Sequence, residues 1–368
     1  MIEATAILKR PSIQNVSRQA GVSTATVSRV MNGRNGVATE TRQAIQEIVK
    51  QLGYAPKPGG RPRGPKTAPG WTNTIALVAP GISRATLNAP VYMDVLHGVE
   101  AALAEVGKTM VLRHLPPEAP TLMEVLPQKV DGVVLFGSAR DERLVRRLQG
   151  TPCVQVMGKI EPRELWDHVS YDNGSLGRIA ADYLLGRGHR HAAFISSARQ
   201  TFFIERGEVF KRAMAAGGGT SQEFLDEALL DMSGSIQQVI PERMQVLVDE
   251  LLAAHPKPTS VFLVADTLAQ GFYAELQRRG LKPGEDLDVI CCNNEQLLLA
   301  HLKPRPATID IHAERVGRKA VEHLLWRLAN PGEPRVTVAL EPTLVPSDGV
   351  QELQDEKSFK HGYAGFTG

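Results

Sequence analysis

Hydroxyl, amide and guanidinium side chains are concentrated in one short segment near the amino terminus. The polar face of this segment carries Thr24, Thr26, Ser28, Arg29 and Asn32. An arginine can donate two hydrogen bonds to a guanine edge, threonine methyl groups can contact thymine, and hydroxyl groups can bind phosphate oxygens. Side chains of these types, without acidic neighbours on the same face, indicate nucleic-acid contact rather than catalysis.

Three short helices are predicted within residues 12–54, and they must position this polar face. The tight turn Gly21-Val22-Ser23 separates the first two helices, and each helix has one apolar face. The apolar positions are Ile13, Val16 and Ala20, then Val27, Val30 and Met31, then Ile45, Ile48, Val49 and Leu52. A short helix behind a glycine turn is the recognition element of a helix-turn-helix, so we expect a DNA-binding head.

The charge of the chain is divided unequally. Residues 1–66 hold eleven Lys or Arg and three Asp or Glu, whereas the whole chain of 368 residues holds 42 and 40. The head therefore has a net charge of +8 and the remainder −6. A basic head suits a polyphosphate, because each neutralised phosphate releases counterions. The alternative is a helical bundle with a solvated basic face, and the turn and the second helix favour DNA.

Composition limits the other classes of protein. The length allows two or three domains. No apolar run approaches the ~20 residues that span a bilayer, and the first ten residues lack the pattern of an export signal. Cys153, Cys291 and Cys292 lie in apolar runs without metal-ligand spacing, which indicates reduced, buried thiols. We expect a cytoplasmic protein with no metal and no cofactor.

Beyond residue 73, short apolar runs alternate with amphipathic segments. The expected strands are 74–80, 109–115, 131–137, 152–158, 191–197, 260–266 and 287–292. The expected helices are 91–106, 174–187, 241–254, 267–279 and 312–329. Continuous apolar strands are typical of parallel sheets with helices on both faces, where ligands bind beyond the carboxyl ends of the strands. No phosphate-binding glycine loop, HExxH or GxSxG motif is present, so an enzyme is not expected.

Several motifs together resemble the lactose-repressor (LacI/GalR) family of transcriptional regulators, from about Ser12 to Pro346. The motifs are V-S-x-x-x-G-V-S-x-x-T-V-S-R-V-x-N-G at 16–33, L-G-Y-x-P at 52–56, V-D-G-V-V-L at 130–135, D-N-G-S-L-G at 172–177 and G-H-R at 188–190. The resemblance implies an all-α helix-turn-helix head joined by a Pro/Gly/Arg-rich hinge to an α/β body. That body would have the two-lobed, periplasmic-binding-protein-like (type I) fold with parallel sheets.

The resemblance and the composition together divide the chain into five parts. These are an N-terminal extension (1–11), a helix-turn-helix domain (12–56), a hinge (57–73), a two-lobed effector-binding and dimerisation domain (74–346) and a mobile tail (347–368). The implied protein is a homodimeric repressor that binds a near-palindromic operator in double-stranded DNA. Its affinity would change when a sugar or a related polar or anionic metabolite binds between the lobes. The alternatives are a regulator without effector response, which uses the body only to dimerise, and a solute-binding protein.

The resemblance also assigns residues of the head to parts of the DNA. Thr24, Ala25 and Arg29 would face base edges. The residues that would hold phosphates are Ser12, Gln14, Ser23, Thr26, Ser28 and Asn32. The alternative for Arg29 is an ion pair within the head.

The hinge departs from the family pattern. Residues 56–70 contain five prolines and four glycines, which cannot form the short helix that family members usually have here. Gly60-Arg61-Pro62-Arg63-Gly64 instead resembles an AT-hook core, in which Arg61 and Arg63 would enter a narrow minor groove. The alternative is a flexible basic tether that raises only non-specific affinity.

Candidate effector contacts follow the predicted strands of the body. They are Ser83, Asn88, Tyr92, Asp172, Arg199, Phe202, Arg206 and Asn293. Arg206 matches the family's effector-contacting arginine, and an arginine beside aromatic rings suits a carboxylate, a phosphate or a pair of sugar hydroxyls. The alternatives are that Arg206 only fixes its helix to the opposite lobe, and that Phe202 and Phe203 belong to the core.

Two departures from the family pattern concern the ligand. Asn293 stands where the family usually has Asp, and Ala265 stands where it usually has Asn. An amide does not repel an anion, so an anionic ligand becomes more favourable here than in sugar-binding members. His189 and His191 flank the arginine of a Gly-His-Arg turn, and no third ligand has suitable spacing for a metal.

Overall fold

The computed structural model describes residues 12–31, 37–52, 72–115, 129–137, 142–158, 166–197, 201–231, 234 and 238–348, without the side chains of Ile13, Ala25 and Thr201. The chain separates into two compact units, residues 1–66 and residues 67–368. Predictions made for Asn32, Arg61, Arg63 and Arg199 lie outside the described residues.

The head consists of three helices, α1 (Ile13–Ala20), α2 (Thr24–Met31) and α3 (Thr39–Leu52), as the apolar periodicity predicts. Their apolar faces meet in a core made of Val16, Val27, Val30 and Ile45. Gly21 ends α1 in the left-handed region with φ 63°, and its N–H donates to the carbonyl oxygen of Ser17. A residue with a side chain would be strained in this conformation, which explains the glycine of the turn.

The first lobe of the body is built on a parallel sheet of six strands. The strands are β1 (Thr74–Pro80), β2 (Thr109–Leu115), β3 (Gly132–Phe136), β4 (Cys153–Val156), β5 (Asp167–Tyr171) and β13 (Thr337–Leu340). Their order is β13-β5-β4-β3-β1-β2. Leu77 of β1 pairs with Leu112 of β2 and with Val134 of β3, which fixes the register.

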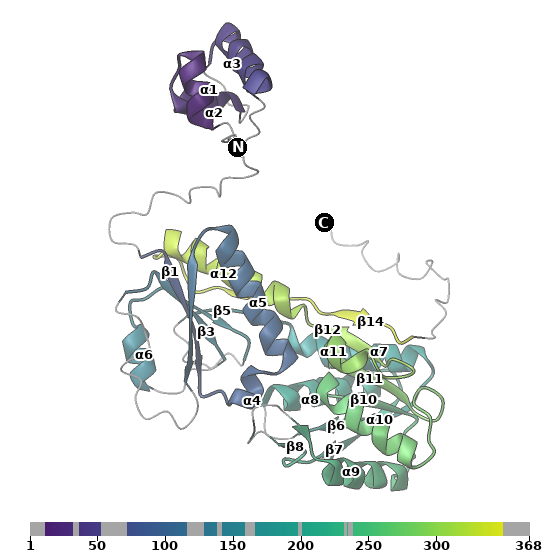
Figure 1. The fold of residues 1–368 in the computed structure, drawn as a ribbon. Helices are drawn as coiled ribbons and strands as arrows, with labels where there is room; N and C mark the ends of the chain where they lie inside the picture. The colour runs from purple at the N-terminus through teal and green to yellow at the C-terminus, as the bar shows by residue number, and fades with distance from the viewer. Residues whose placement is uncertain are drawn as a thin grey trace, which may run out of the picture. The chain divides into compact units, whose positions relative to one another are not determined.

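Helices cover both faces of this sheet (Figure 1). They are α5 (Pro90–Glu105) and α12 (Ala313–Ala329) on one face and α6 (Glu142–Leu148) on the other, and a short helix, α4 (Arg84–Leu87), precedes α5. Leu77 packs in the cluster that contains Val95 of α5, whereas Val78 packs in the cluster that contains Leu144 of α6. Neighbouring residues of β1 are therefore buried on opposite faces, which explains its uninterrupted apolar sequence.

The second lobe repeats this architecture. Its sheet contains β6 (His191–Ser196), β7 (Thr220–Leu225), β10 (Ser260–Leu263), β11 (Asp288–Asn293), β12 (Ala307–Asp310) and β14 (Thr343–Val345). The order is β14-β12-β11-β10-β6-β7, and only β14 runs antiparallel. The helices are α7 (Asn173–Gly186), α8 (Thr201–Ala216), α9 (Pro241–Ala253), α10 (Ala269–Arg278) and α11 (Gln296–Leu299). A short 3-10 helix, η2 (Asp266–Leu268), and a small ribbon of β8 (Leu230–Asp231) and β9 (Gln238–Val239) complete it.

The chain passes between the lobes three times, after β5, after β12 and after β13. This two-lobed arrangement with mostly parallel sheets confirms the predicted fold class. All seven predicted strands and all five predicted helices of the body are present, although β10 ends at Leu263 and is followed by η2. Among the strands of the described residues, the prediction missed β5, β7, β8, β9, β12, β13 and β14.

Candidate functional site

The polar face of α2 is presented at the surface of the head. Thr24 and Arg29 are exposed, and Thr26 and Ser28 are half-buried. The Ser23 hydroxyl caps α2, because its Oγ accepts a hydrogen bond from the Thr26 amide at 3.1 Å. Within the described part of the head, Arg29 makes no ion pair. Its guanidinium is therefore available to an external partner.

The remaining predicted DNA contacts lie on or beside α1. Ser12 precedes α1 and forms a capping box with Asn15, whose Oδ1 accepts a hydrogen bond from the Ser12 amide at 3.0 Å. Gln14 is exposed in the first turn. Ser12 and Ser23 thus fix the amino ends of two helices, and both ends are sites where amide groups attract anions.

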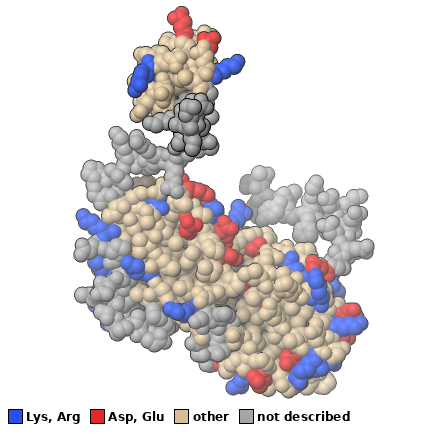
Figure 2. Space-filling model, in the orientation of Figure 1, with Lys and Arg blue, Asp and Glu red and all other residues tan. Residues whose placement is uncertain are grey.

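Charge is distributed differently on the surface of the body. On the face drawn in Figure 2, acidic and basic side chains are interspersed over a larger uncharged surface. No helix in the described part of the chain is long and apolar enough to cross a membrane. Among the residues that the structure describes, no group of three or more His, Cys, Asp or Glu is placed to hold a metal ion.

A cavity of about 360 Å³ lies between the two lobes of the body, at the carboxyl ends of their strands. This is where parallel sheets place ligands, and the volume is within the range of small-molecule sites. The lining residues with polar or aromatic side chains are Thr86, Tyr92, His168, Ser170, Tyr171, Asp172, Asn173, Phe202, Phe203, Glu205, Arg206, Thr267, Asn293, Glu295 and Thr337.

Arg206 lies in the wall of this cavity, with only 1% of the residue exposed. Its Nε donates to Oδ1 of Asn173 at 2.8 Å, its Nη1 donates to the carbonyl oxygen of Val264 at 2.8 Å, and its Nη2 donates to the Tyr171 hydroxyl at 2.7 Å. All three acceptors are uncharged. Among the described residues no carboxylate lies within ion-pair distance of Arg206, so its positive charge is not neutralised by a direct partner.

Aromatic rings surround the guanidinium of Arg206. Its central carbon lies 5.5 Å from the ring centre of Tyr171, 5.8 Å from that of Phe202 and 5.3 Å from that of Phe203. Helical spacing explains the arrangement, because residues three and four apart on α8 share one face. Both predicted functions of Arg206 are therefore compatible with its position: it bonds to Tyr171 of the first lobe and it faces the cavity.

Tyr92 and Tyr171 bring neutral phenol groups from the first lobe. Burial raises the pKa of both hydroxyls above their ordinary value. The Tyr92 ring packs on Phe136, with 5.0 Å between ring centres. The Tyr171 oxygen accepts from Arg206 and keeps its own proton to donate.

The predicted effector residues occupy different positions. Tyr92, Phe202, Arg206 and Asn293 all line the cavity. Asp172 lines it too, but its Oδ1 accepts from the amides of Gly174 and Ser175 and its Oδ2 accepts from the Ser175 hydroxyl, so the carboxylate caps α7.

Two predicted residues lie away from the cavity wall. Ser83 caps α4 by accepting from the Thr86 amide at 3.1 Å, and Asn88 is exposed at the end of α4. Thr86 and Ala89 line the cavity in their place. Ser83 and Asn88 are the two caps of α4, and neither is among the residues that line the cavity.

Several lining residues were missed by the sequence prediction, and Tyr171, Asn173 and Glu295 are the ones among them whose contacts matter most here. Asn173 accepts from Arg206 and donates to the carbonyl oxygen of Phe202 at 3.0 Å. Tyr171 ends β5, and Asn173 and Glu295 lie two positions beyond the ends of β5 and β11, so a position at or just beyond a strand end was the signal that could have found them.

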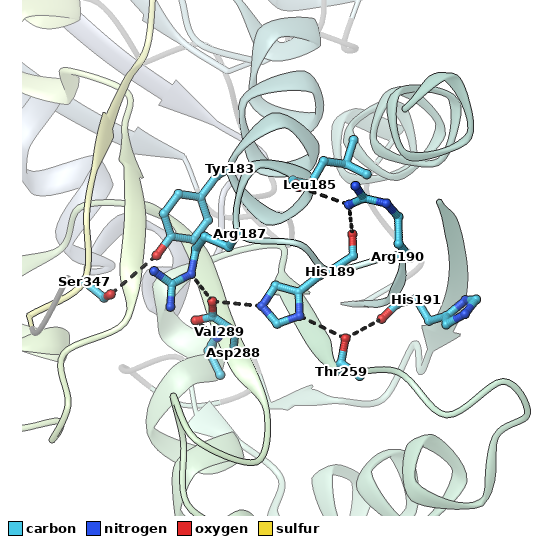
Figure 3. Close-up of polar contacts among 10 residues, drawn as sticks. All are labelled: Tyr183, Leu185, Arg187, His189, Arg190, His191, Thr259, Asp288, Val289 and Ser347. Carbon is cyan, nitrogen blue, oxygen red and sulfur yellow. Dashed lines mark hydrogen bonds and ion pairs between the residues drawn. The ribbon is translucent and has the colours of Figure 1, made fainter. Parts of the chain in front are cut away.

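A polar network occupies the opposite edge of the second sheet, at the amino ends of its strands (Figure 3). Asp288 accepts from Arg187 and lies 3.2 Å from Nε2 of His189, whose Nδ1 lies 2.9 Å from the Thr259 hydroxyl. Burial would raise the pKa of Asp288, but the hydrogen bonds from His189 and Arg187 outweigh it and lower that pKa. The Gly-His-Arg turn thus serves to fasten α7 to the start of β11.

A helix-turn-helix head and a two-lobed body with a cavity between the lobes define a ligand-binding DNA regulator. Residues 12–57 match the family model of "Bacterial regulatory proteins, lacI family", and residues 181–348 match that of the "Periplasmic binding protein-like domain". The chain therefore has a lacI-family helix-turn-helix domain and a periplasmic-binding-protein-like domain, and it is a DNA-binding transcriptional regulator. The resemblance inferred from the motifs is thereby confirmed.

Sequence similarity to known proteins extends over nearly the whole chain. The HTH-type transcriptional repressor PurR of Vibrio cholerae is 28% identical over 354 residues, covering 93% of this chain and 98% of the relative. The Ribose operon repressor of Haemophilus influenzae is 27% identical over 350 residues, covering 93% and 99%. The solved structure of a transcriptional regulator CelR–cellobiose complex superposes with a TM-score of 0.62 at 26% identity, covering 92% of this chain and 99% of the other. These relatives are named as regulators and not as enzymes.

Proposed function

We propose that this chain is a cytoplasmic, homodimeric repressor without enzymatic activity. Its affinity for a near-palindromic operator would change when a sugar, or a related polar or anionic metabolite, binds between the lobes. Two heads related by a twofold axis require such a symmetric DNA site. The mechanism is a population shift, because a ligand that contacts both lobes favours one lobe arrangement over the other.

One observation carries the ligand proposal. Arg206 is a buried guanidinium in the cavity wall, and its three hydrogen bonds all go to uncharged acceptors. A guanidinium has five N–H donors, so two remain for a ligand oxygen. The relatives support a polar ligand, since one is named a ribose operon repressor and another structure contains cellobiose. Tyr92, Asn293 and the ring of Phe202 would complete the contacts.

For the head, we assign base contacts to Thr24, Ala25 and Arg29. Arg29 would read a guanine, and the two others would contact thymine methyl groups. The phosphate contacts would come from Ser12, Gln14, Ser23, Thr26, Ser28 and Asn32. Arg61 and Arg63 of the hinge would enter the minor groove at the operator centre.

The test is selection of binding sites from random duplex DNA by the full-length protein, at about physiological salt. A palindrome is expected, with A·T pairs at its centre if Arg61 and Arg63 bind the minor groove. The selected operator then reports on the ligand, when its affinity is measured with and without each member of a metabolite collection. Salt-sensitive binding to every sequence would contradict the repressor proposal, and an operator affinity that no metabolite changes would favour a regulator without effector response.

A further inference from the structure

Glu295 connects the two lobes at the cavity. It follows β11 in the second lobe and immediately precedes α11, and only 2% of the residue is exposed. Its Oε1 accepts a hydrogen bond at 2.9 Å from the amide of Val91, which lies in the first turn of α5 in the first lobe. An amide in the first turn of a helix has no partner within the helix, so the carboxyl group of Glu295 supplies one from the other lobe.

The second carboxyl oxygen of Glu295 has no such partner. Oε2 is buried, lines the cavity with the rest of Glu295, and has no partner at normal hydrogen-bond geometry in the part of the chain that the structure describes, although the neighbouring Asn293 side chain also acts on this carboxyl group. A buried polar atom left without a partner is unfavourable, so a ligand that bonds to it is favoured. The same residue therefore has one oxygen committed to the opposite lobe and one oxygen available to a molecule in the cavity.

The groups around Glu295 favour its protonated form. The Glu295 amide donates to Oδ2 of the buried Asp266 at 2.6 Å, so a second carboxyl group lies beside it. Burial, and then the charges of Asp266 and Asp94, raise the pKa of Glu295, while the Val91 amide and the Asn293 side chain lower it by less.

Three other titratable or charged groups face this pair of carboxyls, and one of them is the buried Cys291 thiol, which interacts with Asp266 and whose pKa burial raises. The buried Cys292 thiol lies within the electrostatic range of Glu295, and its pKa is raised, chiefly by burial. Arg305 acts on Asp266, whose pKa burial raises. A protonated carboxyl group accepts through one oxygen and donates through the other, and this matches one oxygen bonded to an N–H and one unpaired.

We propose that Glu295 is an effector-contacting and specificity-determining residue, whose Oε2 donates its proton to an anionic oxygen of the effector. This inference rests on the proposed function and narrows it to a ligand with a carboxylate, phosphate or sulfate group. Arg206 supplies the positive charge, and the Tyr171 hydroxyl and Glu295 supply further donors from opposite lobes. Such a ligand keeps the Val91–Glu295 hydrogen bond intact, because it uses the other oxygen.

The test uses full-length protein and probes that keep their charge between pH 6 and pH 9. Sulfate and D-gluconate are the anionic probes, and D-glucose is the neutral counterpart. Dissociation constants come from calorimetry, with the cooperative melting of each variant as the check of folding. In the wild type we expect binding of an anionic probe but not of glucose, and a loss of about tenfold in affinity per pH unit once Glu295 ionises.

Three variants separate the proposal from a purely structural role. Glu295→Gln keeps an acceptor for Val91 and places an amide donor at Oε2, so it should bind the anion with an affinity that no longer falls with pH. Glu295→Ala should lose most of the affinity for the anionic probe, because it removes the donor at Oε2. Glu250→Gln, at an exposed position of α9, should behave as the wild type.

The possible results divide clearly. Equal pH dependence in the wild type and Glu295→Gln would overturn the proposal, and so would binding of glucose in preference to both anions or of none of the three probes. The proposed function fails separately, if the selected operator shows no response to any metabolite. An operator that responds to a neutral sugar would therefore contradict the role of Glu295 and leave the repressor function standing.

Discussion

The Nη2 of Arg206 donates to the hydroxyl oxygen of Tyr171 at 2.7 Å, and this bond joins the second lobe to the first beside the cavity. Tyr171 ends β5 and Arg206 lies on α8. Among the described residues, Tyr171 is the only one of the first lobe that accepts a hydrogen bond from the Arg206 guanidinium, and its side chain is a neutral phenol. A neutral acceptor orients the guanidinium without cancelling its charge, which leaves that charge for a ligand.

Tyr171→Phe removes this acceptor and keeps the ring. We expect the free energy of unfolding to fall by about 1–3 kcal/mol, because a buried charged donor loses its partner. Chemical denaturation measures the change. Tyr273→Phe is the matched control, since its hydroxyl donates to the Pro304 carbonyl within the second lobe. An unchanged stability of Tyr171→Phe, with a loss for Tyr273→Phe, would show that the contact between lobes contributes nothing.

Arg29→Ala tests sequence reading by the head. We expect the selected operator to bind about 5- to 150-fold more weakly, since a bidentate contact to guanine contributes about 1–3 kcal/mol of discrimination. Affinity for random duplex DNA should change much less. Fluorescence anisotropy at fixed salt measures both, and Lys50→Ala at an exposed position of α3 controls for the loss of one charge. Equal losses on operator and random DNA would indicate that Arg29 contacts phosphate only.

Ala38 is a weak start for α3. Its carbonyl oxygen accepts from the Arg42 amide at 2.9 Å, so it occupies the capping position, but its methyl group cannot accept a hydrogen bond. Ala38→Ser should stabilise the head by about 0.5–2 kcal/mol. The same change at Ala44, inside α3, should destabilise it slightly because serine is the poorer helix former. Amide hydrogen exchange of α3 in the full chain distinguishes them, and equal effects of both changes would contradict the capping argument.

Continuous apolar sequences were sufficient to locate the central strands, because β1, β6 and β11 are buried along almost their whole length. β5 was missed since it begins Asp167-His168, which is polar in sequence and buried in the structure. The partner that makes the burial of Asp167 possible is distant in sequence. Arg327 of α12 donates to both carboxylate oxygens of Asp167, at 2.6 and 2.8 Å. A polar residue with such a distant partner cannot be assigned to a strand from local pattern.

The same limit applies to the cavity. Arg206 and Phe202 were predictable from the helix that follows a strand, and Tyr92 from the start of another helix. Glu295 was not, because its partner Val91 lies in the other lobe and 204 positions away in sequence. Asp172 was assigned to the ligand because of its place at the junction of the lobes, just after Tyr171 ends β5, whereas local amide groups of α7 use its carboxylate as a cap.

Close packing of α5 on α12 depends on two glycines. A β-carbon on Gly317 would lie 2.1 Å from the Val95 carbonyl oxygen, and one on Gly98 would lie 2.0 Å from that of Glu314. Gly317→Ala should therefore force the helices apart and destabilise the body by more than about 2 kcal/mol. Gly186→Ala is the control, because no atom lies within 4 Å of its β-carbon position and its effect should be neutral or slightly stabilising. Thermal melting of both variants measures the difference, and similar melting temperatures would refute the packing argument.

Asp288 should make the stability of the body depend on acid pH. Its pKa is lowered in the folded protein, so its stabilising contribution is present above the ordinary pKa of 3.8 and is lost as the pH falls below it. Asp288→Asn should cost about 1–3 kcal/mol at pH 7, because Arg187 and His189 lose a charged partner and Arg187 is one-third exposed. The difference in stability between Asp288→Asn and the wild type should shrink by pH 3.

The control is Asp182→Asn, at an exposed ion pair, which should change stability by less than about 0.5 kcal/mol. Chemical denaturation at both pH values measures these changes. A loss of stability in Asp288→Asn that is the same at pH 7 and pH 3 would mean that the packing of Asp288, and not its charge, stabilises the body.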